Sequence, residues 1–290
     1  MRRQVATLAR DRVSGATALA RRAALLLRSA ARDDGRGLVR WQQDLRALGE
    51  GLMAAQPAMG SVLTVVDLAW RAGEEATRVR EGERAVRRAM ERYLRWQPGA
   101  IARVAGRLPG LLPRDAACLT LSSSEVVYRA LLAARHRGRL ARVMVAESRP
   151  GCEGVATARR LAARGVPVAV IVDALSPAVV AEVDVVVMGA DAVTRMAVWN
   201  KCGSLGVALA ASAAGRPTLV VTTEDRLLPP PLARRVVIPA AEPAAVLPRP
   251  PRGVRVVNRL FDATPLRLVT WVVTEEGAME PATVKRRLAR

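Results

Sequence analysis

The clearest candidate for chemistry in this 290-residue chain is a carboxylate that follows a short apolar run. The run, Val185 to Met188, has no polar alternation, a pattern typical of a strand buried on both faces of a parallel sheet. Gly189-Ala190-Asp191 ends it. Ligands of open α/β sheets bind beyond the carboxyl ends of the strands, so Asp191 is well placed to exchange protons with a bound substrate.

Two further polar side chains follow this carboxylate along the chain. Asn200 and Lys201 open a pattern that predicts a helix from Trp199 to Ala214, ending at Gly215. An amide, an ammonium and helix N–H groups would then face the same crevice as Asp191. A simpler interpretation makes Asp191 a turn residue and Asn200 a helix cap. This segment alone leaves both interpretations open.

Metal ions and nucleotide cofactors have few residues to bind them in this sequence. The one histidine is His136, and Cys118, Cys152 and Cys202 form no CxxC pair, so no metal site is expected. No GxGxxG motif follows a predicted strand and no GxxxxGK[ST] motif occurs, so no cofactor is expected. Three widely spaced cysteines are typical of reduced thiols, which predicts a cytoplasmic location.

The chain is strongly basic, with a formal net charge of +20 and a pI near 11.6, which suggests nucleic-acid binding. Lysine occurs only at Lys201 and Lys285, however, and the arginines are spread along an alanine-rich chain, which indicates compositional bias. Aromatic residues make up only 3% of the chain, so a basic stripe interleaved with stacking side chains is missing. Nucleic acid is therefore not the favoured partner. No long uncharged apolar run predicts a membrane span.

Two hydrophobic periods divide the chain. From Val5 to about Arg103, apolar residues recur at three- and four-residue spacing, which predicts about five helices. Breaks are expected at Asp33-Asp34-Gly35, Gln56-Pro57 and Pro98-Gly99. After Pro109-Gly110, short apolar runs alternate with helical stretches, which predicts a mostly parallel sheet with right-handed crossovers. The expected fold class is α/β, with an N-terminal helical domain (1–108) before a Rossmann-like domain (109–290).

Eight strands are expected in the second domain, at residues 117–121, 142–146, 166–172, 185–188, 218–222, 235–238, 254–257 and 269–274. The proline-rich piece from Pro229 to Pro251 interrupts the alternation. We expect it to be an ordered excursion over the surface, with a mobile lid as the alternative.

Three separated segments resemble one protein family. They are VMVAESRPGCEGVATARRLAARGVPVAVIVDA (143–174), GADAVT with NKCGS (189–194 and 200–204), and VNRLFDATPLRLVTWVVTEEG (257–277). The family comprises the regulatory alpha, beta and delta subunits of translation initiation factor 2B, methylthioribose-1-phosphate isomerase and ribose-1,5-bisphosphate isomerase. The resemblance extends from about Asp11 to Pro281. It implies a helical domain, a Rossmann-like domain, and homodimers or larger homo-oligomers formed through the C-terminal domain.

The resemblance also implies a pocket for a sugar 1-phosphate and assigns roles to its residues. Asp191 takes the position of a catalytic acid that acts with a cysteine to convert an aldose 1-phosphate into a ketose 1-phosphate. Asn200 and Lys201 match the pair that holds hydroxyl and phosphate oxygens, and Arg149 matches an arginine at the pocket wall. The N-terminal DRxSGA pattern, which faces the sugar phosphate, is matched by Arg12, Ser14 and Gly15.

The second catalytic position departs from the family pattern. The TH(C/S) motif aligns on Thr120-Leu121-Ser122, so Ser122 stands in place of the thiol and Leu121 in place of the histidine. A serine hydroxyl with no adjacent base transfers protons far less readily than a thiol with a pKa near 8.5. Ser123 and Ser124, before a predicted helix, still form a phosphate cradle of hydroxyls and helix N–H groups, with a plain N-cap as the alternative.

Two more departures concern the phosphate contacts. Gln56 stands where the bisphosphate isomerases have an arginine, so one phosphate clamp is missing. The segment TTEDRLLPP (222–230) replaces the family's ESYKF, so that the expected lysine falls on Leu227, with Arg226 one place away.

Three functions compete. The favoured one is an initiation-factor-2B-like protein that binds a sugar phosphate with weak or no catalysis, because Ser122 replaces the thiol. The alternative is a divergent aldose–ketose isomerase of ribose 1,5-bisphosphate or methylthioribose 1-phosphate, in which Asp191 carries most of the proton transfer. The third is a translation-linked scaffold with a vestigial pocket. The expected ligand is a phosphorylated sugar or a nucleoside-derived small molecule.

Overall fold

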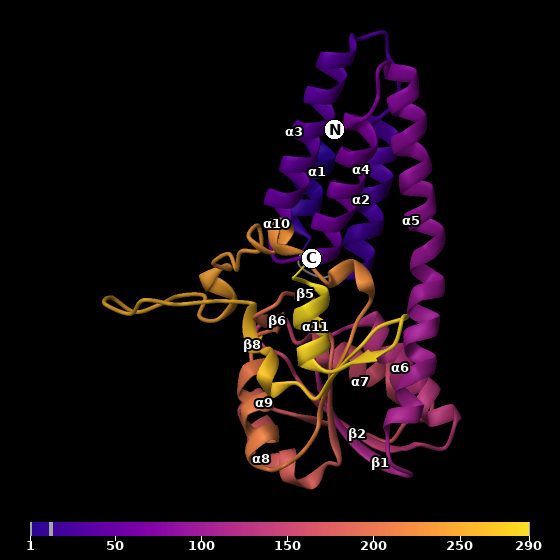
Figure 1. The fold of residues 1–290 in the computed structure, drawn as a ribbon. Coiled ribbons are helices and arrows are strands. Elements are labelled where there is room, and N and C mark those ends of the chain that lie inside the picture. Colours follow the sequence, from indigo (N-terminus) through magenta and orange to yellow (C-terminus); the bar gives the residue numbers. More distant parts are fainter. Residues whose placement is uncertain (1, 12–13, 290) are drawn as a thin grey trace.

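The computed structural model describes residues 2–11 and 14–289, and five helices make up its N-terminal part (Figure 1). They are α1 (Arg2–Arg10), α2 (Ala16–Ala30), α3 (Leu38–Ala55), α4 (Gly60–Glu74) and α5 (Val79–Arg107). The apolar stripes expected from the sequence form their shared core, in which Trp41 is fully buried and its Nε1 donates to the Ala31 oxygen at 2.9 Å. The predicted helical N-terminal part is confirmed.

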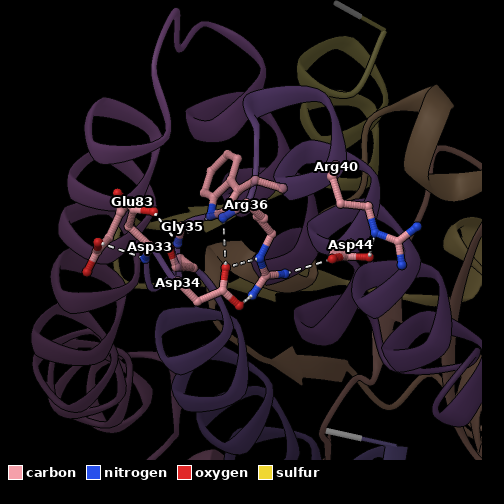
Figure 2. A network of polar contacts seen from close by, with 9 residues as sticks. Asp33, Asp34, Gly35, Arg36, Arg40, Asp44 and Glu83 are labelled. Carbon is pink, nitrogen blue, oxygen red and sulfur yellow. Dashed lines mark hydrogen bonds and ion pairs between the residues drawn. The ribbon is translucent and has the colours of Figure 1, made fainter.

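The loop from α2 to α3 contains the predicted break at Asp33-Asp34-Gly35, and polar contacts fix it to the bundle (Figure 2). The Asp33 N–H donates to Glu83 of α5 at 3.0 Å, and Arg36 pairs with Asp34 and with Asp44, the latter at 2.7 Å. Asp34 raises the pKa of the Arg36 guanidinium through their hydrogen bond. These charges serve the turn itself and lie outside the cavity described below.

The predicted break at Pro98-Gly99 is wrong, because α5 continues through both residues. A proline inside a helix removes one hydrogen bond, and buried residues on both sides of Pro98 hold this helix in place. Tyr93 packs in the core of the bundle, whereas Ile101 belongs to the core beneath the sheet. Helix α5 therefore spans both parts of the molecule.

The second part is a seven-stranded sheet in the order β10-β9-β7-β4-β1-β2-β3. Its strands are β1 (Ala116–Leu121), β2 (Leu140–Ala146), β3 (Val168–Ile171), β4 (Val185–Met188), β7 (Thr218–Val221), β9 (Trp271–Val273) and β10 (Ala278–Met279). All neighbouring pairs are parallel except β9 with β10. The predicted α/β class with a mostly parallel sheet is confirmed. Strand order reverses between β1 and β4, which makes their carboxyl ends the switch point where ligands of such sheets bind.

Helices connect and cover these strands (Figure 1). They are α6 (Glu125–His136), α7 (Glu153–Ala162), α8 (Ser176–Val179), α9 (Ser204–Ala213) and α11 (Pro281–Arg287), whereas α10 (Pro230–Ala233) packs against α4 of the bundle. The buried core of the sheet is rich in β-branched residues, as expected for strands covered on both faces, and Val143, Val185, Val187 and Val221 lie in it.

The predicted helix from Trp199 to Ala214 is wrong in its first part. A second sheet of β5 (Ala192–Val193), β6 (Ala197–Lys201) and β8 (Phe261–Pro265) takes up those residues. Antiparallel pairing with β8 holds the segment extended up to Lys201. Gly203, at φ +101°, then adopts a left-handed conformation from which α9 begins. Asn200 and Lys201 therefore lie at the end of a strand.

The strands predicted at 235–238 and 254–257 are absent from the described chain, because these residues find no sheet to join. After α10 the chain extends away from the body as a long arm and returns to β8 (Figure 1). Residues 242–255 are all exposed, and one bridge, between Ala240 and Arg259, joins the two sides of the arm. The first part of the proline-rich segment, including Leu232 and Val236, packs on the bundle, and the rest projects from the surface.

Candidate functional site

A cavity of about 400 Å³ lies where the helical bundle meets the carboxyl ends of β1 and β4. It brings together eight of the residues predicted from the sequence: Ser14, Gly15, Ser122, Ser123, Ser124, Asp191, Asn200 and Lys201. Arg12 lies outside the described residues. Arg149 does not line the cavity: its side chain is exposed, and its backbone N–H donates to Asp173 at 2.6 Å.

Asp191 is fixed through its backbone by both parts of the molecule. Its N–H donates to the Trp199 oxygen at 2.8 Å, and its C=O accepts from the Gly60 N–H at 2.7 Å. A Cβ at position 60 would lie 2.9 Å from that same oxygen, so only glycine allows α4 to begin this close. The bundle therefore helps to set the place of the carboxylate.

The carboxylate of Asp191 has an unusual electrostatic environment. Burial raises its pKa to about 6, although the positive charges of Arg226 and Lys201 act to lower it. Within the described part of the chain, no side chain forms a hydrogen bond or ion pair with this carboxylate. A group that titrates near neutral pH and faces a cavity is suited to general acid–base catalysis.

Lys201 is only 3% exposed and is held by a carboxylate of the same cavity. Its Nζ lies 3.1 and 3.0 Å from the two oxygens of Glu153. The neighbouring Asn200 donates from Nδ2 to the Ser204 hydroxyl at 2.9 Å, and that hydroxyl donates to the Lys201 oxygen at 2.6 Å. The end of β6 is therefore rigid, and the charge of Lys201 is already paired.

The three serines after β1 have different environments. Ser122 has a left-handed backbone, with φ +65°, held by its N–H donating to the Ser148 hydroxyl at 2.7 Å. Ser124 is the N-cap of α6, and its hydroxyl accepts from the Val127 N–H at 3.4 Å, as in the alternative that makes it a plain N-cap. Ser123 lines the cavity at the N-terminus of this helix, where free N–H groups favour an anion.

Arg226 is the main site residue absent from the sequence-based assignment. It ends a 3₁₀ turn, Glu224–Arg226, and is only 4% exposed. Its Nη1 donates to the Ala190 oxygen at 2.6 Å and its Nη2 to the Thr17 hydroxyl at 2.9 Å. Its Nε is buried without a partner, and no carboxylate of the described chain forms an ion pair with it. A buried cation in this state is a site for an anionic ligand.

Buried polar contacts from the bundle position Arg226. The hydroxyl of Tyr93 donates to Asp225 at 2.7 Å, and Gln97 donates to that hydroxyl and to the Thr17 oxygen, both at 3.1 Å. Helices α5 and α2 therefore hold the 3₁₀ turn against the cavity. The sequence placed Arg226 one position from an expected lysine, and this was the only signal for it.

Gln56 does not replace the missing arginine as a ligand group. Its side chain is buried at the cavity wall, and its Nε2 donates to the Leu8 oxygen at 2.7 Å and to the Asp11 oxygen at 3.3 Å. The amide thus ties the end of α1 to the bundle. At the rim of the cavity, Arg160 pairs with Glu125 at 2.8 Å.

The described residues contain no group of three or more metal-ligating side chains that would suit a metal ion. Among the helices of residues 2–11 and 14–289, none is long and apolar enough to cross a membrane.

Comparison with known proteins identifies a family and several sequence relatives. The model of the initiation factor 2 subunit family matches residues 12–281. The ribose 1,5-bisphosphate isomerase of Archaeoglobus fulgidus is 29% identical over 246 residues, which cover 83% of this chain and 78% of the relative. The methylthioribose-1-phosphate isomerase of Heliobacterium modesticaldum is 35% identical over 190 residues, covering 59% and 55% of the two chains.

Solved structures show the same fold. The translation initiation factor eIF-2B of Pyrococcus horikoshii superposes with a TM-score of 0.82 at 24% identity, over 96% of each chain. The 5-methylthioribose 1-phosphate isomerase of the same organism gives a TM-score of 0.70 at 21% identity, over 99% of this chain and 85% of the other. At these identities the likeness shows a shared fold and does not show a shared function.

Proposed function

This chain belongs to the initiation factor 2 subunit family, and from that premise we propose that it is an aldose–ketose isomerase of a ribose 1-phosphate derivative. Relatives named as isomerases of ribose 1,5-bisphosphate and methylthioribose 1-phosphate favour this alternative over the non-catalytic binder first preferred from the sequence. The substrates we propose are these two sugar phosphates.

The reaction rearranges the sugar without adding or removing atoms. The bond between C1 and the ring oxygen breaks, and that oxygen takes up a proton. The hydrogen on C2 moves to C1, and the C2 hydroxyl loses its proton as the C2 carbonyl forms. The site must therefore supply one proton donor and one proton acceptor on either side of the reacting carbons.

Asp191 is the proposed proton donor. Its pKa of about 6 leaves roughly one molecule in ten protonated at pH 7, whereas an ordinary aspartate is almost wholly ionised there. The carboxylate lies in a cavity of the size of a small ligand, on backbone fixed by α4 and β6. Because no side chain of the described residues hydrogen-bonds to the Asp191 carboxylate, this group is available to a substrate oxygen.

Phosphate binding is assigned to Arg226 and to the N-terminus of α6. The guanidinium of Arg226 is buried, lines the cavity and lacks a carboxylate partner in the described chain, so a phosphate would compensate its charge. Ser123 and the free N–H groups of α6 offer a second anion site. The observation that carries the proposal is that Asp191 and a buried cation without an ion-pair partner in the described chain line the same cavity.

Turnover of the two sugar phosphates tests the function. The purified protein is incubated with ribose 1,5-bisphosphate or methylthioribose 1-phosphate, and aldose and ketose phosphates are separated by anion-exchange chromatography. We expect a ketose product from at least one substrate with the wild type and at least 100-fold less with Asp191→Asn. Equal product formation by wild type and variant would refute the role of Asp191.

A second candidate function, a sugar-phosphate-binding protein without turnover, is favoured by one observation. The hydroxyl of Ser122 has no base hydrogen-bonded to it in the described chain, although its backbone groups bind Ser148 and Thr157. Calorimetric binding of a sugar phosphate at micromolar concentration, with no ketose formed, would establish this second function.

We also propose that the protein acts as a homodimer or larger homo-oligomer. Large apolar side chains are exposed around β3 and α9, including Val170, Val172 and Leu209 at 50, 56 and 49%. Contiguous apolar patches mark interfaces, and these side chains are the candidates for such a patch. Light scattering after size exclusion is expected to give at least twice the 31.1 kDa mass of the chain.

A further inference from the structure

Glu153 is a carboxylate of the cavity that has no role in the sequence-based assignment. It is the first residue of α7, which begins against the carboxyl end of β2. The Gly154 N–H donates to the Glu147 oxygen at 3.1 Å, and a Cβ at position 154 would lie only 1.8 Å from the Ala146 oxygen. The helix therefore begins as close to the strand as the backbone permits, and this contact fixes the position of Glu153.

The same helix contacts Ser122, where the hydroxyl lacks a base. The hydroxyl of Thr157 donates to the Ser122 oxygen at 2.9 Å. Residues four apart share one face of a helix, so Glu153 lies one turn before Thr157 on the face that meets Ser122. Both Glu153 and Ser122 line the cavity. A carboxylate thus stands on the side of the cavity that needs a second proton-transfer group.

Lys201 orients this carboxylate. Its buried ammonium contacts both oxygens of Glu153, at 3.1 and 3.0 Å, and its backbone position is fixed by β6. Glu153 in turn acts on Asp191, because its negative charge raises the pKa of the Asp191 carboxyl. Among the carboxylates that line the cavity, Glu153 is therefore paired with an ammonium, whereas Asp191 has no ion-pair partner in the described chain.

We propose that Glu153 is the second catalytic residue, accepting the proton of the C2 hydroxyl while Asp191 donates to the ring oxygen. This rests on the proposed isomerase function. The electrons of the broken C1–O bond go to the ring oxygen, which takes the Asp191 proton. The C2 hydrogen moves to C1 with its bonding pair, and the O–H pair of the C2 hydroxyl becomes the second carbonyl bond. Exchange with solvent returns both carboxyl groups to their starting states.

Other charged groups surround this pair and enter its pH dependence. Lys201 and Arg226 act on the Asp191 carboxyl, whereas Asp173 and Asp262 act on the neighbouring Cys202 thiol. The other charged residues that line the cavity are Asp11, Arg21, Glu125 and Arg160. Cys202 also titrates in this region, and burial raises the pKa of its thiol. For this reason the test variants substitute Glu153 alone and leave these neighbouring groups unchanged.

The test is the substitution Glu153→Gln, which keeps the side-chain shape and an oxygen for Lys201 but removes the basic carboxylate. The matched control is Glu50→Gln, because Glu50 holds Arg235 by both oxygens at the same 3.1 and 3.0 Å on the helical part of the molecule. The kcat and KM are measured from pH 5 to pH 9 with the substrate that the wild type converts. Glu153→Asp retains a carboxylate and guards against a folding failure of the first variant.

We expect Glu153→Gln to lower kcat on the order of 100-fold, with KM within threefold of the wild type. Glu153→Asp should recover part of kcat, and Glu50→Gln should behave as wild type. A raised KM with unchanged kcat would show that Glu153 only orders Lys201, and would overturn the inference. Absence of turnover in the wild type would instead refute the isomerase function itself.

Discussion

Replacing Asp191 with asparagine should stabilise the folded protein, and only at pH values where the carboxyl group is ionised. Burial holds its pKa at about 6, against an ordinary value of 3.8. Because each pKa unit corresponds to about 1.4 kcal/mol, the ionised carboxylate destabilises the fold by about 3 kcal/mol. Asparagine has nearly the same shape without the charge, so Asp191→Asn removes this cost.

The sign of the pH dependence follows from the raised pKa. Below pH 3.8 the carboxyl group is neutral in folded and unfolded chains, and the substitution should change the free energy of unfolding little. As the pH rises from about 4 to about 6, the unfolded chain releases its proton first, and wild-type stability falls relative to the variant. Above pH 7 the difference should be constant, at about 2 to 3 kcal/mol.

Urea unfolding at pH 5 and pH 8 measures this difference. Asp67→Asn is the control, since it removes a carboxylate paired with Arg71 on α4, outside the cavity. We expect Asp191→Asn to raise the free energy of unfolding more at pH 8 than at pH 5. An equal effect at both pH values, or a destabilisation at pH 8, would show that burial does not raise the pKa of the Asp191 carboxyl group.

Three further substitutions, with Gly106→Ala as a control, test the charges and the packing around the site. Arg226→Met should weaken binding of a sugar phosphate at least 30-fold in calorimetric titration, because truncating a buried charged partner costs about 2 to 5 kcal/mol; unchanged affinity would place the phosphate elsewhere. Tyr93→Phe leaves buried Asp225 without one donor and should lower the free energy of unfolding in urea by about 1 to 3 kcal/mol. Gly154→Ala should lower the melting temperature, since its Cβ has no room. Gly106→Ala is the control, because a Cβ there meets nothing within 4 Å, and it should raise the free energy of unfolding by about 0.5 to 1 kcal/mol. A Gly154→Ala protein more stable than the Gly106→Ala protein would contradict the packing.

Much of the fold was predictable because local patterns and tertiary packing agree. The buried run Val185–Met188 forms β4 as expected, and the stripes of the first hundred residues form a bundle. Prediction failed where distant residues decide. The residues of β6 read as helix in sequence, but pairing with β8 holds them extended. Pro98 reads as a break, but packing on both of its sides carries α5 through it.

In the site, too, local sequence patterns predict some residues, and contacts between distant residues decide the others. Asp191 and the serines after β1 were predictable because they follow buried strands directly, and parallel strands end at one edge of a sheet. Arg226 lies in a short turn whose place depends on Tyr93, more than 100 residues earlier in the chain. Glu153 begins a helix, where an acidic residue usually needs no explanation, and only its contact with Lys201 reveals it.

The central claim is that this cavity converts an aldose 1-phosphate into a ketose 1-phosphate through Asp191. The most direct measurement is ¹³C NMR of the protein incubated with ribose 1,5-bisphosphate or methylthioribose 1-phosphate labelled at C2. The account predicts that the C2 signal moves from the carbinol to the carbonyl region with the wild type and stays in place with Asp191→Asn. A signal that remains in the carbinol region with the wild type, for both substrates and with binding shown by calorimetry, would contradict it.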